Sequence, residues 1–263
     1  RLLSKTPFLA KIRAILGVLE EKLDHPVDIE FACAGNDFYL LQCRSQSYQA
    51  ENKPAPIPDQ VNPDHILFSA HRYITNGEMQ PITHIVYVNP EKYRQLESYQ
   101  DMLEVGQIIG SLNKQLPRRK FILMGPGRWG SRGDQKLGVK VTWSDIRNTA
   151  MLIEIARKEG DYLPEPSFGT HFFQDLVEAS IRYIPLYPDD PQTIFNESFL
   201  ENKKNQLQDF LPSRGSFSEV IQVINIPETT GGMVLRVLMN AEEETGLAFL
   251  DSRHQDQDEE FGD

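Results

Sequence analysis

Residues 27–44 read Val-Asp-Ile-Glu-Phe-Ala-Cys-Ala-Gly-Asn-Asp-Phe-Tyr-Leu-Leu-Gln-Cys-Arg. The Gly-Asn-Asp triplet is a turn signal because glycine and asparagine tolerate positive φ, and the β-branched and aromatic residues on both sides are typical of strands. The stretch therefore predicts a β-hairpin. If Asn36 occupies the centre of the turn, Asp28 lies opposite Arg44 and Glu30 lies opposite Gln42.

These four polar residues are expected to share one face of the hairpin, because strand side chains alternate between faces. The opposite, apolar face is expected to be core and carries Ile29, Phe31, Leu41 and Cys43. Two carboxylates at positions i and i+2 suit Mg²⁺, and an arginine suits a phosphate oxygen. A solvated hairpin with a cross-strand Asp/Arg pair explains the same pattern, so the residues alone leave both interpretations open.

The motif Asp-Ile-Glu-Phe, a turn and Leu-Leu-Gln-Cys-Arg-Ser resembles the end of the ATP-grasp nucleotide-binding domain in the phosphoenolpyruvate synthase and pyruvate phosphate dikinase family. That family carries Asp-Ile-Glu-Trp, a turn and Gln-x-Arg-Pro there, after a helix, and residues 6–23 supply a helical pattern. The resemblance implies that Glu30 and Gln42 hold Mg²⁺ and the bridged phosphates of ATP, with support from Asp28, and that Arg44 faces the phosphate tail. Phe31 and Ser45 depart from the family's Trp and Pro.

The composition is that of a packed globular protein, with 40% hydrophobic residues and 17 glycines in 263 residues. The formal net charge of -11 argues against a nucleic-acid coat protein. Nine acidic residues against one arginine in 241–263 predict a solvated acidic tail, placed at 251–263. No apolar run approaches the ~20 residues of a membrane span and no signal peptide is seen, so a cytoplasmic location without a membrane partner is expected. Cys33 and Cys43 have no metal-type spacing and are expected to be reduced core residues.

The predicted fold class is α/β with a mixed sheet. A small ATP-grasp-end helix plus hairpin (1–50) precedes a proline-rich linker (51–63) and a larger mixed α/β domain (64–250) of unassigned role. Strands are expected at 65–74, 83–88, 139–143, 151–155 and 183–187, with 220–226 and 233–239 as a final strand pair. Residues 118–124 are expected to form a basic lead-in followed by a short buried strand. Helices are expected at 7–23, 90–116, 169–179 and 195–210. Because the chain starts at Arg1 and resembles an ATP-grasp ending at its front, we expect a C-terminal portion of a larger protein.

Residues 125–133, Gly-Pro-Gly-Arg-Trp-Gly-Ser-Arg-Gly, form a glycine loop after a predicted strand. A dinucleotide fingerprint requires a helix at the third glycine, and a P-loop requires Lys and a hydroxyl residue there; neither is predicted. Seven basic residues against one acid in 118–140 still suit an anion, with Arg128, Arg132 and the backbone of Gly127 and Gly130 as candidate ligands. Alternatively, the glycines turn a corner, Trp129 packs on the sheet and the arginines pair with acids.

Three further segments, Gly-Pro-Gly-Arg-Trp-Gly-Ser-Arg, Thr-Trp-Ser-Asp-Ile and Gly-Thr-His-Phe-Phe-Gln-Asp, resemble the C-terminal region of bacterial proteins described as having a PEP/pyruvate-binding domain. This supports the parentage and implies no mechanism. The family's Thr-Ser-His-Ala phosphohistidine motif is absent from the sequence. His171 is the nearest match, and a packed helix-cap histidine is expected there.

The function expected from the resemblance is the C-terminal portion of an ATP-dependent, dikinase-like phosphotransferase, with ATP and Mg²⁺ as cofactors. Its partners would be a nucleotide and a small phosphorylated metabolite, and no nucleic acid. No catalytic residue is assigned to this chain, which should be inactive without an N-terminal ATP-grasp lobe and a phosphohistidine domain. The alternative is a non-catalytic regulatory or ligand-binding module that uses the Gly/Arg loop to bind a phosphorylated metabolite or a protein partner.

Overall fold

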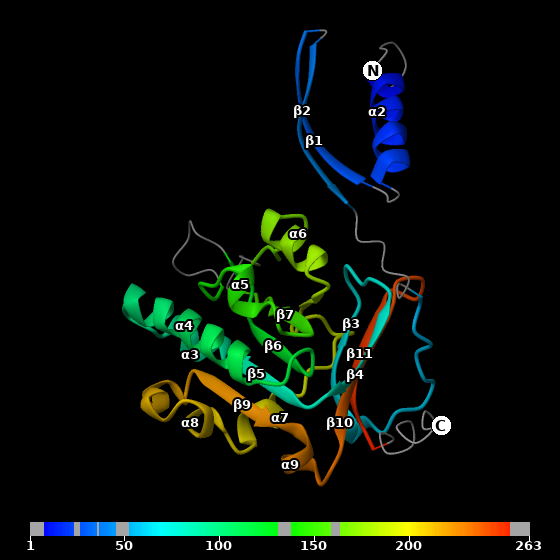
Figure 1. Cartoon of the computed structure of the whole chain (residues 1–263). Helices are drawn as coiled ribbons and strands as arrows, with labels where there is room; N and C mark the ends of the chain where they lie inside the picture. Colours follow the sequence, from blue (N-terminus) through cyan, green and yellow to red (C-terminus); the bar gives the residue numbers. More distant parts are fainter. Residues whose placement is uncertain are drawn as a thin grey trace, which may run out of the picture. The chain divides into compact units, whose positions relative to one another are not determined.

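The computed structural model describes residues 8–23, 27–35, 37–45, 53–130, 138–158 and 164–252 (Figure 1), apart from the side chains of Leu23, Asp28, Arg44, Ser45 and Gln80. Internal contacts divide the chain into two units, 1–51 and 52–263. Helices and mixed and antiparallel sheets confirm the predicted mixed α/β class. Among the described helices, none is long and apolar enough to cross a membrane.

The described part of the first unit comprises one helix and one hairpin. Its elements are α2 (Phe8–Leu23), β1 (Val27–Ala34) and β2 (Asp37–Ser45). The two strands pair antiparallel, and α2 contacts the hairpin through Phe8, whose ring lies 5.7 Å from that of Phe31. The Phe31 ring in turn stacks on Phe38 at 5.0 Å. These aromatic contacts fix which face of the hairpin the helix covers.

The second unit is built around a five-stranded sheet in the order β8-β7-β6-β5-β9. Its strands are β5 (His84–Val88), β6 (Phe121–Pro126), β7 (Met151–Ile155), β8 (Arg182–Leu186) and β9 (Ile221–Asn225). β5 to β8 are parallel and β9 is antiparallel to β5. Both faces of this sheet are covered, so β5 to β7 are buried along their whole length. The near-continuous apolar sequences of these strands are typical of such a buried parallel sheet.

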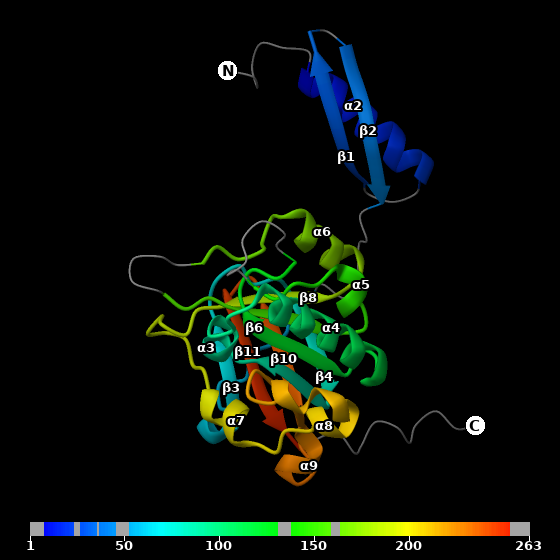
Figure 2. The same cartoon turned by 90° about the vertical axis from the view of Figure 1, so that its left-hand side faces the viewer.

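Helices cover one face of this sheet (Figure 2). They are α3 (Pro90–Arg94), α4 (Tyr99–Gln115), α5 (Trp143–Ile146), α6 (His171–Glu178), α8 (Leu207–Phe210) and the 3₁₀ helix η2 (Pro212–Phe217). The longest, α4, turns Val105, Ile109 and Leu112 onto the sheet, and all three are fully buried. The predicted helix over 90–116 is thus two helices, separated at Ser98, which caps α4 by accepting from the Asp101 backbone N–H.

A second, antiparallel sheet covers the other face, in the order β3-β11-β10-β4 (Figure 1). Its strands are β3 (Ile66–Ala70), β4 (Gly77–Ile82), β10 (Val234–Asn240) and β11 (Thr245–Asp251), flanked by η1 (Pro63–His65), α7 (Glu197–Asn202) and α9 (Ile226–Thr230). Phe68, Val237 and Ala248 from this sheet pack against Ile122 and Ile153 of the five-stranded one. The unit is therefore a three-layer helix/sheet/sheet sandwich.

Two sequence-based expectations are wrong. Residues 139–143 form no strand, because Thr142 caps α5 in a capping box with Asp145. The segments 220–226 and 233–239 do not pair, since β9 and β10 belong to different sheets. The acidic tail placed at 251–263 lies outside the described residues beyond Ser252. Before it, Glu242 and Glu243 lie in the β10–β11 turn, and β11, which was not predicted, occupies an inner position in the four-stranded sheet as far as Asp251.

The proline-rich segment lies against the second unit. Its described part, from Lys53, has no helix or strand before η1. The Ala55 backbone N–H donates to the Met239 carbonyl at 3.2 Å, and Ala55 is buried. Ile57 and Val61 pack on Leu238, Leu247 and Phe249, on the face of the four-stranded sheet that is turned away from the five-stranded one.

Candidate functional site

The hairpin brings the four polar positions into the predicted register. Asp28 is paired with Arg44 and Glu30 with Gln42. Glu30 is exposed and Gln42 is half-buried, whereas the side chains of Asp28 and Arg44 lie outside the described part of the structure. A carboxylate and a side-chain carbonyl on neighbouring strands form a donor set that fits Mg²⁺, which takes one or two protein oxygens and leaves the rest to water and phosphate.

The apolar face of the hairpin differs from the prediction because a β-bulge follows Glu30. Phe31 pairs with Leu40, so Leu41 has no partner on β1. The bulge moves Leu41 off the face that α2 covers and leaves it 65% exposed. Cys33 is exposed and Cys43 is half-buried, which corrects their assignment as core residues.

The glycine loop begins at the carboxyl end of β6, the edge of a parallel sheet where ligands commonly bind. The backbone donors of the two candidate ligands Gly127 and Gly130 are already in use. The Gly127 N–H donates to the Ile155 carbonyl at 3.1 Å, and the Gly130 N–H donates to the Val139 carbonyl at 3.2 Å. Trp129 is 1% exposed and packs in the helix-side core, as the structural alternative predicts. Arg132 lies outside the described residues.

A buried carboxylate that the sequence analysis did not single out holds this loop. Glu154 of β7 is fully buried, and its Oε1 accepts from the Trp129 backbone N–H at 2.7 Å and from Ser167 Oγ at 2.6 Å. Its Oε2 accepts from the Ser167 backbone N–H at 2.7 Å and from Tyr183 Oη at 2.6 Å. One side chain therefore ties together the glycine loop, the segment before α6 and strand β8.

Burial raises the pKa of the Glu154 carboxyl, and the four hydrogen bonds act in the opposite direction. Two of the donors are backbone N–H groups, which cannot accept, so each oxygen of Glu154 must accept one hydrogen bond. Burial beside Glu154 also raises the pKa of Tyr183, which keeps its hydroxyl a donor. Glu154 thus binds the glycine loop through one backbone N–H, that of Trp129, and the Gly127 and Gly130 N–H groups bind carbonyls. A single acid within the apolar run Met151-Leu-Ile-Glu-Ile155 is the signal that could have revealed it.

Arg128 lies on the outer side of the same loop. Its Nη1 is 3.7 Å from Glu165 Oε2, and the side chains are 35% and 83% exposed. An ion pair this exposed contributes about 0–1 kcal/mol, so it leaves the guanidinium available to another anion.

His171 and His84 lie in different elements, α6 and β5, and do not form a shared ligand site. His171 is exposed at the start of α6, and Thr170 caps that helix by accepting from the Phe173 backbone N–H, so His171 is not the packed cap expected. His84 is buried in β5, and burial lowers its pKa, which keeps it neutral. Within the described ranges, no group of three or more His, Cys, Asp or Glu side chains is placed to hold a metal ion.

Comparison of the chain with protein-family models, with curated proteins and with solved structures gives no match.

Proposed function

We propose that this chain forms the C-terminal portion of an ATP-dependent phosphotransferase similar to phosphoenolpyruvate synthase, and that its hairpin contributes to the metal and phosphate site. The observation that carries the proposal is the register of β1 and β2, which pairs Asp28 with Arg44 and Glu30 with Gln42. A shift of one residue would move each strand's polar residues to opposite faces, so this register is a precondition of the shared site.

In this proposal Glu30 and Gln42 hold Mg²⁺, which neutralises charge on the phosphates of ATP during transfer. Arg44 provides a bidentate phosphate ligand and Asp28 orients its neighbours. The remaining nucleotide contacts would come from an ATP-grasp lobe, and the phosphate carrier from a separate domain. The exposed apolar residues of this unit, Phe31 at 40% and Leu41 at 65%, support a hairpin that packs against a further part.

The test is Glu30→Gln in a protein that contains the complete nucleotide-binding domain. Loss of the metal-binding carboxylate is expected to lower kcat for ATP-dependent phosphate transfer about 10²–10⁴-fold, a size typical of lost electrostatic stabilisation of the transition state. Asp37→Asn is the matched control because it removes one negative charge at the turn end of the same hairpin and should retain activity. Equal activities of the two variants would rule out the metal role of Glu30.

A second candidate function is a ligand-binding module that uses Arg128. The specific observation is that the loop backbone is fixed by Glu154 while the Arg128 guanidinium stays partly exposed. Because the Gly127, Trp129 and Gly130 N–H groups are occupied, an anion would be bound through arginine side chains rather than through a backbone nest.

This candidate predicts that phosphate, AMP or phosphoenolpyruvate binds the chain and that Arg128→Ala weakens binding about tenfold, the loss of one charge-assisted hydrogen bond. Calorimetric titration measures the effect. Arg118→Ala is the control, since Arg118 is also exposed but lies before β6. Binding that is the same in both variants would exclude the Arg128 loop, and binding that requires residues 1–50 would favour the hairpin.

A further inference from the structure

Four exposed cations lie at the amino-terminal end of strand β6, away from the hairpin and the glycine loop. One is in the last turn of α4, two precede β6 and one follows α5. They are Lys114, Arg118, Lys120 and Arg147, and all four are exposed. We call this set the basic edge.

Three hydrogen bonds hold the segments of the basic edge together. The Asn148 backbone N–H donates to Asn113 Oδ1 and the Asn148 Nδ2 donates to the Asn113 carbonyl, both at 2.9 Å. The Arg119 backbone N–H donates to the Asn148 carbonyl at 2.7 Å. Each of the four cations is the neighbour in sequence of one of these three residues, so the fold holds their backbones at one place.

The basic edge has an excess of positive charge. Within the described part of the chain, none of its four side chains forms an ion pair. Two acids lie nearby: Asp145, which accepts from the Thr142 backbone N–H at 2.8 Å, and Glu178 near the end of α6. Arg119 adds a fifth positive charge, although its guanidinium is bound to carbonyls at the end of α6. In a chain with a formal net charge of -11, this surface favours an acidic partner.

An acidic partner is present in the chain itself, in residues 253–263 after β11. This segment contains one arginine and five carboxylates, those of Asp256, Asp258, Glu259, Glu260 and Asp263. It is the segment for which the sequence analysis predicts only solvation.

The sheet topology starts this segment at the same end of the molecule as the basic edge. Asp251, the last residue of β11, pairs with Val234, and the next residue of β10, Leu235, pairs with Ile82 at the end of β4. The residue after Ile82, Thr83, donates its backbone N–H to the carbonyl of Lys120 at 2.7 Å. Two strand spacings, about 10 Å, therefore separate the end of β11 from the strand that leads to the basic edge.

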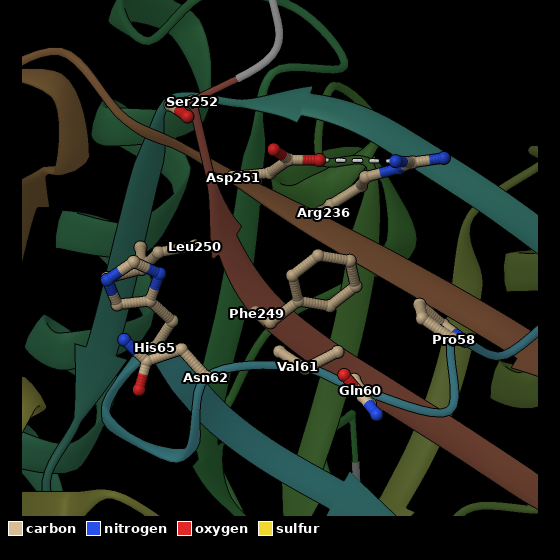
Figure 3. A pocket seen from close by; sticks show the side chains of 10 residues that line it. All are labelled: Pro58, Gln60, Val61, Asn62, His65, Arg236, Phe249, Leu250, Asp251 and Ser252. Atoms are coloured by element: carbon tan, nitrogen blue, oxygen red, sulfur yellow. Dashed lines mark hydrogen bonds and ion pairs between the residues drawn. The ribbon is translucent and has the colours of Figure 1, made fainter.

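The segment is long enough to reach this surface. Eleven residues in an extended conformation span about 36 Å, which exceeds the separation several-fold. The cation beside the start of the segment offers no alternative, because Arg236 is already paired with the carboxylates of Asp251 and Glu78 at 3.2 and 2.7 Å (Figure 3). Two carboxylates against one guanidinium leave no positive charge there to attract a third.

We propose that residues 253–263 bind the basic edge through their carboxylates. A single exposed ion pair is weak, but several cations act together here, and the covalent connection gives the segment a millimolar effective concentration. The surface is then occupied by the chain's own acidic segment. A polyanionic partner of the basic edge would first have to displace that segment.

The test uses a nitroxide spin label on Gln257→Cys in the full chain. Cys33 and Cys43 are replaced by serine, and both lie in the other unit. The amide NMR signals of Lys120 and Asn148 are expected to lose about half of their intensity, as a contact with a Kd of about 1 mM predicts at a millimolar effective concentration. The signals should recover in about 1 M NaCl, where the screening length falls to about 3 Å. Full intensity at low salt, or broadening that survives high salt, would overturn the proposal.

Charge reversal locates the contact. Arg118→Glu is expected to restore most of the intensity of the Asn148 signal. Lys92→Glu is the matched control, because Lys92 is also exposed but lies in α3, beyond the carboxyl end of β5, and the broadening should remain. Equal effects of the two variants would contradict binding at the basic edge.

A mixed sample separates binding within one chain from binding between two copies. Spin-labelled chain without isotope label is added to isotope-labelled chain that carries no spin label. The Lys120 and Asn148 signals should then keep their intensity. Broadening in the mixture equal to that in the single labelled chain would assign the contact to a second copy and overturn the proposal.

Discussion

Glu154→Gln is expected to lower the free energy of unfolding by about 3 kcal/mol, because it leaves a buried backbone donor without an acceptor. Each carboxylate oxygen of Glu154 accepts one backbone N–H, from Trp129 or from Ser167. Glutamine has one oxygen, and either orientation of its amide points an NH₂ group at one of those two N–H groups. A flip of the amide therefore cannot restore the network.

Urea unfolding of wild type and variant measures the change, followed by the emission of buried Trp129 in a Trp143→Phe background. Glu219→Gln makes the same chemical change at an exposed position and should alter stability by less than about 0.5 kcal/mol. Tyr183→Phe removes one reversible donor and should cost about 1 kcal/mol. Wild-type stability in Glu154→Gln would contradict the requirement that both oxygens of this side chain accept a backbone N–H.

The elements predicted best from the sequence are those in which one local signal determines the structure. The hairpin is fixed by Gly35, whose φ is +63°, and by the alternation on either side, so its register followed directly. The buried parallel strands followed from continuous apolar runs. The bulge at Leu41 did not, because no residue in the alternating pattern of β2 marks where the extra residue lies.

The elements that were missed depend on partners distant in the sequence. β11 was not predicted as a strand, because its inner place comes from pairing with β3, which lies far earlier in the chain. The role of the glycine loop was open for the same reason, because residues 125–133 contain no acid and the anion that holds the loop is Glu154 of the next strand. The sequence of the loop therefore suggested that it binds an anion, but it did not show that a carboxylate of the protein itself, Glu154, contacts the loop.

Gly106→Ala should also destabilise the protein strongly, although alanine is the better helix former. Gly106 lies inside α4, and a Cβ built there would be 2.0 Å from the Lys140 carbonyl oxygen. The helix gains about 1 kcal/mol from alanine. The backbone after the glycine loop must move to admit the methyl group, at a cost of overpacking that we expect to exceed this gain and to leave a net loss of about 2 kcal/mol.

Gly110→Ala, one turn later in α4, is the matched control for this clash. A Cβ at Gly110 would meet the Asp145 side chain at 3.2 Å, and a side chain can shift where a carbonyl in a fixed segment cannot. Its stability should stay within about 1 kcal/mol of wild type, because the propensity gain offsets the adjustment. Equal losses in the two variants would show that α4 does not rest on the Lys140 backbone. A loss confined to Gly106→Ala, with a red shift of Trp129 emission, would show that α4 supports the glycine loop from behind, because Val139 accepts the Gly130 N–H.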